Sequence, residues 1–186
     1  MNLNQRWHTF RRVPSFYLPH EWRDWVLDRG SLTQRLIIAS NGHFSVRVVR
    51  QQWLQPNRDE ALLLGSPIKS LALIREVELL CHGEVWVVAR SVIPNTTLTG
   101  PECQVSVLGN RPLGAFLFKS RAMKRGPLQV SKASPEFLSM QAGQTLQDPL
   151  WGRRSLFFLH GKPLLVSELF MPAALSGLPE QPGQTQ

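Results

Sequence analysis

The sequence predicts a single α+β domain in which helices cover one face of an antiparallel sheet. Two long stretches, REVELLCHGEVWVVAR and SLFFLHGKPLLVSELFMP, each consist of two apolar strands around a tight turn. We place the turn at His82–Gly83 in the first and about Gly161–Lys162 in the second. Only short segments elsewhere have helical spacing. At 186 residues the chain is long enough to bury a full core as one domain. Hairpins combined with few helices are typical of an antiparallel sheet with helices on one side.

The first half of the chain alternates short helices with a strand. Trp22, Trp25 and Val26 have helical spacing, and Gly30 follows as a possible C-cap. Ser31 is a possible N-cap for a helical turn in SLTQRLIIAS. GHFSVRVVRQQWLQ alternates apolar and polar residues, which predicts a half-buried strand. We interpret PNRDEALLLGS as a polar connection.

After the first hairpin, NTTLTGPECQVSVLGN predicts a turn and a helix, with proline near the helix start. RPLGAFLFKS is a short helix or a strand. Residues 120–150 are rich in Ser, Gln, Lys and Pro and predict a surface loop. We expect one domain over residues 1–175, followed by a disordered tail at 176–186.

Composition and motifs argue against several classes of protein. The net charge is +8 at pH 7, but lysines and arginines are scattered, apart from FKSRAMKRG. No DNA- or RNA-binding motif is present, so we expect no nucleic-acid partner. The longest apolar runs have the length of strands, so no membrane insertion is expected. No pair of histidines has the spacing of metal ligands, which predicts no metal site.

The two cysteines form no disulfide framework, and we expect Cys81 to be a free buried thiol. The N-terminus does not have the pattern of a secretory signal. Both features favour a cytoplasmic location. No exposed apolar helix stripe stands out, so a monomer is expected.

Arginines stand at both ends of the first hairpin. With a two-residue turn at His82–Gly83, Cys81 pairs with Glu84 and Arg75 faces Arg90. Two facing cations ~5 Å apart repel each other by ~3 kcal/mol at an effective dielectric of ~20. This geometry indicates a bound anion. Two alternatives remain open: each arginine forms a structural ion pair with a nearby glutamate, or a bulge at His82–Gly83 places the arginines on opposite faces.

A carboxylate interrupts the apolar row of the last strand, because Glu168 shares a face with Leu164, Val166 and Phe170. Such a group must be paired, hydrogen-bonded or raised in pKa. A structural salt bridge to an arginine is one explanation, and a functional carboxylate is the other. In WGRRS we expect Arg153 to be exposed where a strand begins.

Five blocks in this order resemble the chorismate pyruvate-lyase family, the enzymes that make 4-hydroxybenzoate for ubiquinone synthesis. The similarity runs from about Trp25 to Ala173, and its blocks are SLTQRL, LIREVELLCHGEVWVVARSVIP, TLTGPE, LGNRPLGAFLF and LWGRRSLFFLHGKPLLVSELFMP. It implies a six-stranded antiparallel sheet and a site enclosed beneath helical flaps. It also implies elimination of pyruvate from chorismate, which needs no cofactor. The segment at 120–150 looks longer than is usual in the family.

The resemblance also implies site residues. Arg75 matches the family arginine that binds the aromatic carboxylate, and Arg90 matches the arginine that closes the paired strand. From the chemistry of chorismate we expect Arg90 to hold the enolpyruvyl group. Glu168 matches the glutamate that meets the ring hydroxyl. We expect these three to be catalytic. Leu113 matches the leucine of the PLG block, and Leu32 stands at a flap position that is commonly methionine. Leu32, Leu113, Arg75 and Glu168 are the expected substrate-binding residues.

Two alternatives accompany this interpretation. The same fold resembles the effector-sensing domains of GntR-type regulators, which bind small ligands and catalyse no reaction. A related lyase could release 3-hydroxybenzoate from the same substrate.

Overall fold

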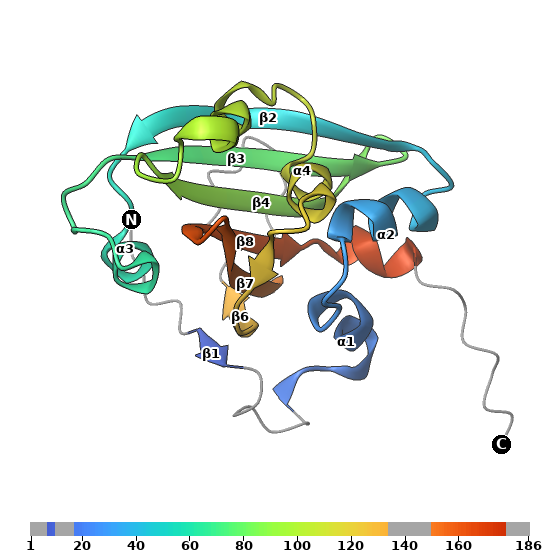
Figure 1. Ribbon diagram of the computed structural model, residues 1–186. Coiled ribbons are helices and arrows are strands. Elements are labelled where there is room, and N and C mark those ends of the chain that lie inside the picture. The colour runs from blue at the N-terminus through green and yellow to red at the C-terminus, as the bar shows by residue number, and fades with distance from the viewer. Residues whose placement is uncertain (1–6, 10–16, 134–149, 178–186) are drawn as a thin grey trace, which may run out of the picture.

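The computed structural model describes residues 7–9, 17–133 and 150–177, which form one α+β domain around a large antiparallel sheet (Figure 1). The sheet has eight strands, not six, in the order β1-β6-β7-β8-β4-β3-β2, with β5 paired to β7. The strands are β1 (His8–Thr9), β2 (Phe44–Leu54), β3 (Ala72–Cys81), β4 (Glu84–Pro94), β5 (Lys124–Arg125), β6 (Gln129–Ala133), β7 (Leu150–Leu159) and β8 (Lys162–Phe170).

Strands β5 and β6 lie within the segment that was predicted to be a surface loop. Their sequence is largely polar, so no alternation marks them as strands. Both pair with β7, and this pairing, not local propensity, forms them. The rest of that segment, 134–149, and the predicted tail from residue 178 onward lie outside the described residues.

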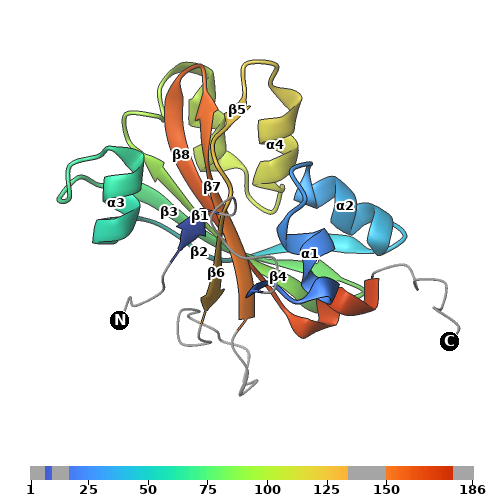
Figure 2. The same cartoon turned by 90° about the horizontal axis from the view of Figure 1, so that it is seen from below.

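Helices lie on both faces of the sheet, which corrects the prediction of one covered face. The helices are α1 (His20–Val26), α2 (Leu32–Ala39), α3 (Arg58–Leu64) and α4 (Leu113–Lys119), with 3₁₀ helices η3 (Gly100–Val107) and η5 (Pro172–Gly177). Figure 2 shows α1, α2 and α4 together on one side and α3 on the other. Leu64 of α3 packs against Ile74, Val92 and Leu165, which point away from α2 and α4.

The helix caps explain where α2 and α3 begin. Ser31 is the N-cap of α2, as predicted, and its hydroxyl accepts a hydrogen bond from the Gln34 backbone N–H at 3.4 Å. Helix α3 was missed and interpreted as a polar connection. There the Asn57 backbone N–H donates to Glu60 Oε2 at 2.9 Å, and Gly65 ends the helix at φ +64°.

The hairpin of β3 and β4 has the predicted two-residue turn but a different register. His82 and Gly83 both have positive φ, and Cys81 pairs with Glu84. A bulge follows, because Leu80 pairs with Val85 whereas Leu79 pairs with Val87, so Trp86 is the extra residue.

Beyond this bulge the register is shifted by one residue. Arg75 therefore pairs with Ser91, and Arg90 pairs with Glu76. The prediction that the two arginines face each other is wrong. They lie on opposite faces of the sheet, as the bulge alternative expected, but the bulge is at Trp86 and not at His82–Gly83. The bulge also allows the consecutive residues Trp86 and Val87 to join the same core cluster.

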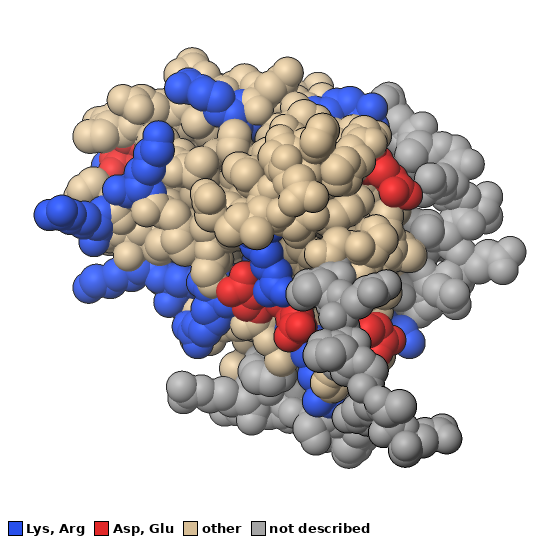
Figure 3. All heavy atoms as spheres, turned by 90° about the vertical axis from the view of Figure 1, so that its right-hand side faces the viewer, with Lys and Arg blue, Asp and Glu red and all other residues tan. Residues whose placement is uncertain are grey.

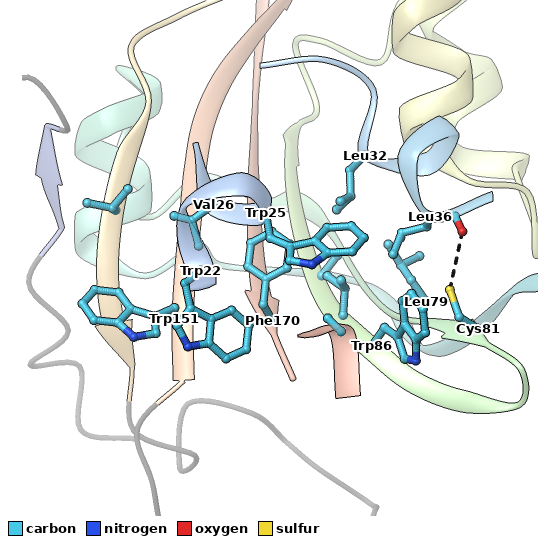
Figure 4. Packing of buried hydrophobic residues seen from close by; sticks show 14 of the residues in the cluster. Trp22, Trp25, Val26, Leu32, Leu36, Leu79, Cys81, Trp86, Trp151 and Phe170 are labelled. Carbon is cyan, nitrogen blue, oxygen red and sulfur yellow. Dashed lines mark hydrogen bonds between the residues drawn. The ribbon is translucent and has the colours of Figure 1, made fainter. Parts of the chain in front are cut away.

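That core cluster fills the space between the sheet and helices α1 and α2 (Figure 4). Trp25 of α1 is fully buried and lies between Trp86 of β4 and Phe170 of β8, with ring centroids 6.2 Å apart in both pairs. Cys81 is a buried free thiol, as predicted, and its Sγ lies 3.9 Å from the Leu36 carbonyl oxygen. These contacts fix α1 and α2 on the sheet.

Charged side chains are distributed over the surface. In the view of Figure 3, lysines and arginines stand mainly along one side, and uncharged residues cover most of the upper centre. None of the helices in the described part of the chain is long and apolar enough to span a membrane.

Candidate functional site: an arginine-lined pocket

A pocket lies between the sheet and the helices α2 and α4. The space between its lining atoms, including the part open to solvent, is about 610 Å³. Its charged lining residues are Arg75, Arg125, Arg153 and Glu168. Four of the five predicted site residues, namely Leu32, Arg75, Leu113 and Glu168, line this pocket, and Arg90 does not.

The pocket floor consists of two rows of side chains that run across four strands. Because directly paired residues of antiparallel strands point to the same face, the register defines these rows. One row is Arg75, Ser91, Val166 and Ser155, and the other is Val77, Ala89, Glu168 and Arg153. Arg75 therefore stands at one end of the floor, Ser91 and Ala89 lie near its middle, and Glu168 and Arg153 lie towards the other end.

The pocket roof is formed where α2 and α4 meet. Leu32 and Thr33 begin α2, and Leu113 and Gly114 begin α4. A Cβ atom placed on Gly114 would lie only 2.6 Å from Thr33 Oγ1, so glycine lets the two helices come this close without moving the Thr33 side chain.

Arg75 is a buried cation held by uncharged acceptors. It is 1% exposed, and its guanidinium donates to Gln51 Oε1 at 2.9 Å and to the Gly109 and Arg111 carbonyls at 2.8 and 3.2 Å. No carboxylate of the described residues forms a salt bridge with it. Burial lowers the pKa of Arg75. An anion bound beside it would offset this loss of hydration.

Glu168 forms a salt bridge with Arg153, whose Nε donates to Glu168 Oε2 at 2.5 Å. The structural salt bridge expected for Glu168 is thus confirmed, although the same carboxylate also faces the pocket. Arg153 is 1% exposed and also donates to the Trp25 carbonyl at 3.0 Å and to the Asp28 carbonyl. The prediction of an exposed Arg153 is wrong, and sequence reasoning missed its place in the site.

Arg125 was not singled out from the sequence. It belongs to β5, and its Nε donates to Ser155 Oγ at 3.1 Å. Its guanidinium carbon lies 5.2 Å from the centroid of the Phe157 ring. Burial, together with the nearby charge of Arg153, lowers the pKa of Arg125 to about 10, so it remains a cation at neutral pH.

Arg90 lies on the face of the sheet opposite the pocket. Its Nε donates to Glu60 Oε1 at 2.8 Å, and a second guanidinium nitrogen donates to Glu76 Oε1 at 2.6 Å. Burial alone would lower the pKa of Arg90, but the hydrogen bonds and charges of Glu60 and Glu76 raise it. The alternative of a structural ion pair with Glu76 is therefore confirmed for Arg90. The described residues contain no cluster of potential metal ligands.

Fold and pocket together define an α+β domain with an arginine-lined pocket between its sheet and its helices. A family model described as "Chorismate lyase" matches residues 4–176. The chain belongs to the chorismate lyase family.

Relatives of similar length support this assignment, and all three described here are named "Probable chorismate pyruvate-lyase". The chain is 47% identical over 154 residues to the protein of Methylococcus capsulatus, which covers 82% of this chain and 95% of that protein. It is 39% identical over 163 residues to the protein of Psychromonas ingrahamii, covering 84% and 85%. The protein of Pseudomonas putida is 39% identical over 158 residues, covering 85% and 84%.

Solved structures of transcriptional regulators share the fold. A GntR-family regulator from Bacillus cereus superposes with a TM-score of 0.53 at 13% identity, covering 77% of this chain and 99% of that one. The effector domain of PhnF from Mycobacterium smegmatis gives a TM-score of 0.51 at 14% identity, covering 77% and 90%. At this level of identity the likeness concerns the fold alone.

Proposed function

We propose that this protein is a chorismate pyruvate-lyase, which eliminates pyruvate from chorismate to give 4-hydroxybenzoate. Membership of the chorismate lyase family and the names of its relatives support this activity. The observation that carries the assignment in this chain is the pocket itself, with Arg75 at one end of the floor and Glu168 towards the other.

Arg75 binds the ring carboxylate in this proposal. A guanidinium donates two parallel hydrogen bonds to a carboxylate, and here the group is already oriented by Gln51 and two backbone carbonyls. The small side chains of Ala89 and Ser91 leave space for the ring above the floor. Leu32 and Leu113 cover the ring from the roof.

Glu168 meets the C4 hydroxyl at the other end of the ring. In the reaction the C3–oxygen bond breaks, the C4 hydrogen leaves as a proton, and the C4–H electron pair completes the aromatic ring. The released enolpyruvate takes up a proton to become pyruvate. We place Glu168 as the hydrogen-bond acceptor of the hydroxyl and as the relay for the proton. Arg153 orients this carboxylate through its salt bridge. Arg90 has no direct contact with substrate in this proposal, because its partners lie on the opposite face.

The beginnings of α2 and α4 act as flaps that open to admit substrate and close over the ring. Their close contact at Thr33 and Gly114 supports this role. A cytoplasmic monomer without a nucleic-acid partner stays a prediction, and light scattering of the purified protein measures its oligomeric state.

Replacing Arg75 tests the assignment. Arg75→Ala should lower kcat/KM for chorismate at least about 100-fold, because charge-assisted hydrogen bonds to the carboxylate are lost. The assay follows 4-hydroxybenzoate by ultraviolet absorption and pyruvate by a coupled enzyme, with circular dichroism to verify the fold. Retained turnover in a folded variant contradicts the role of Arg75.

The wild-type assay also separates the alternatives. Chromatography of the product distinguishes 4-hydroxybenzoate from 3-hydroxybenzoate. A protein that binds chorismate without releasing pyruvate would be a ligand-sensing domain of the same fold.

A further inference from the structure

The pocket has more positive charge than one carboxylate requires. Three arginines and one glutamate line it, which leaves two positive charges in excess. Glu168 and Arg153 form a salt bridge with each other. Arg75 and Arg125 are thus the two lining cations that form no salt bridge with a carboxylate of the described residues.

Arg125 is placed at the Glu168 end of the pocket. Its Nε is held by Ser155, which ends the floor row that begins with Arg75. Ser155 lies on β7, the same strand as Arg153, whereas Arg75 lies on β3, three strands away. Arg75 and Arg125, the two guanidinium groups without a salt bridge, are therefore held at opposite sides of the pocket floor. Glu168 lies on a strand between these two sides.

This arrangement matches the substrate of the proposed function, on which the inference rests. Chorismate carries its ring carboxylate opposite the hydroxyl-bearing carbon, and its enolpyruvyl ether stands on the carbon next to that hydroxyl. When Arg75 binds the ring carboxylate and Glu168 meets the hydroxyl, the second carboxylate lies at the Glu168 end. Arg153 is there already engaged in its salt bridge with Glu168 and in hydrogen bonds to two backbone carbonyls. Arg125 is the remaining cation.

We propose that Arg125 binds the carboxylate of the enolpyruvyl side chain and makes the pocket specific for a dianion. This assigns to Arg125 the task that the sequence suggested for Arg90. The guanidinium also stands beside the oxygen that becomes negative as the C3–oxygen bond breaks, so its charge stabilises the leaving enolpyruvate. The product 4-hydroxybenzoate lacks this side chain and therefore has no carboxylate for Arg125 to bind.

The difference between substrate and product provides the test. Arg125→Gln should raise KM for chorismate about 10- to 100-fold, as expected for a lost charged hydrogen-bond pair, and should also lower kcat. The Kd of 4-hydroxybenzoate, measured by calorimetry, should change less than about threefold. Arg75→Gln should instead weaken both ligands. Lys124→Gln, a neighbouring exposed cation outside the pocket, is the matched control and should leave both values unchanged.

A second measurement isolates the carboxylate contact and does not depend on turnover. In the wild-type protein, 3-(carboxymethoxy)-4-hydroxybenzoate should bind about 10-fold more tightly than its uncharged side-chain amide, 3-(carbamoylmethoxy)-4-hydroxybenzoate. Arg125→Gln should abolish this preference, and Arg125→Lys, which keeps the charge, should retain part of it. An unchanged preference in Arg125→Gln, or an equal loss of 4-hydroxybenzoate affinity, overturns the proposal. Absence of pyruvate release by the wild type would instead contradict the proposed function.

Discussion

Arg75 and Arg90 are identical side chains on neighbouring strands, yet their surroundings give them different tasks. Arg75 is held by an amide and two carbonyls, which supply no compensating charge. Arg90 is held by the two carboxylates of Glu60 and Glu76, which neutralise it. A buried arginine with uncharged partners is prepared for an anionic ligand, whereas one with two carboxylates stabilises the fold.

Replacing Arg90 should therefore affect stability more than ligand binding. Arg90→Gln leaves Glu60 buried without its salt-bridge partner, whereas Glu76 keeps its pair with Arg50, so the free energy of unfolding should fall by about 3 kcal/mol. Urea denaturation measures this, and KM for chorismate should stay within about threefold. Lys69→Gln is the control, because this exposed side chain should change the free energy of unfolding by less than about 0.5 kcal/mol. A large rise in KM with unchanged stability would contradict the structural role.

The second hairpin shows how a shift of one residue hides a site residue. The sequence analysis placed its turn about Gly161–Lys162, whereas the turn residues are His160 and Gly161, both at positive φ. With the correct turn, counting back along both strands pairs Arg153 directly with Glu168. The His-Gly turn of the first hairpin was the available signal for this register. Arg125 offered no such signal, because only the pairing of β5 with β7 brings it to the pocket.

At the scale of elements, both hairpins, the strand β2 and the helices α1 and α2 followed from periodicity and caps. Helix α3 could not be predicted in this way, because its seven residues form a stable helix only through contacts on the sheet. The bulge at Trp86 was also not predictable from local pattern. It depends on Trp25 and Phe170, which are distant in the sequence, and on the core that they form.

The contact of α2 with α4 predicts a specific defect. Gly114→Ala places a Cβ atom against Thr33 Oγ1, so either the buried Thr33 side chain must rotate or the helices must separate, and we expect the roof to open. A displacement of this size should lower kcat/KM by up to about 100-fold and speed the release of 4-hydroxybenzoate, both measurable by stopped-flow fluorescence. Adding Thr33→Ala removes the oxygen that clashes and should restore most of the activity. Failure of this double variant to recover would show that the clash is not the cause.

At the scale of the whole molecule, Glu102 joins η3 to the hairpin of β7 and β8. Lys162 Nζ donates to Glu102 Oε2 at 2.8 Å, and His160 Nδ1 lies 2.7 Å from Oε1. The hydrogen bond from Lys162, helped by His160 and opposed by burial, lowers the pKa of Glu102 to about 2. This carboxylate therefore connects the layer of helices that carries the roof to the sheet that carries the floor.

The lowered pKa predicts how stability depends on pH. The folded state holds Glu102 ionised below the pKa of about 4.3 that an unfolded glutamate has. Its contribution is fully present above that value and is lost as the pH falls from about 4.5 towards 2. Glu102→Gln should thus be less stable than wild type at pH 7, and the difference should shrink in this window. Urea denaturation between pH 7 and 3 measures it, with the exposed Glu84→Gln as the control, and a difference independent of pH contradicts the role.

The bulge at Trp86 has a consequence for comparing this chain with its relatives. Because one additional residue sets which side of the sheet each later residue of β4 faces, the length of the hairpin matters as much as the identity of its arginines. A homologue that lacks this residue would present the equivalent of Arg90 to the ligand, even with every other position conserved. The role of a β4 residue can therefore be transferred to the aligned residue of a homologue only if that homologue also has the bulge.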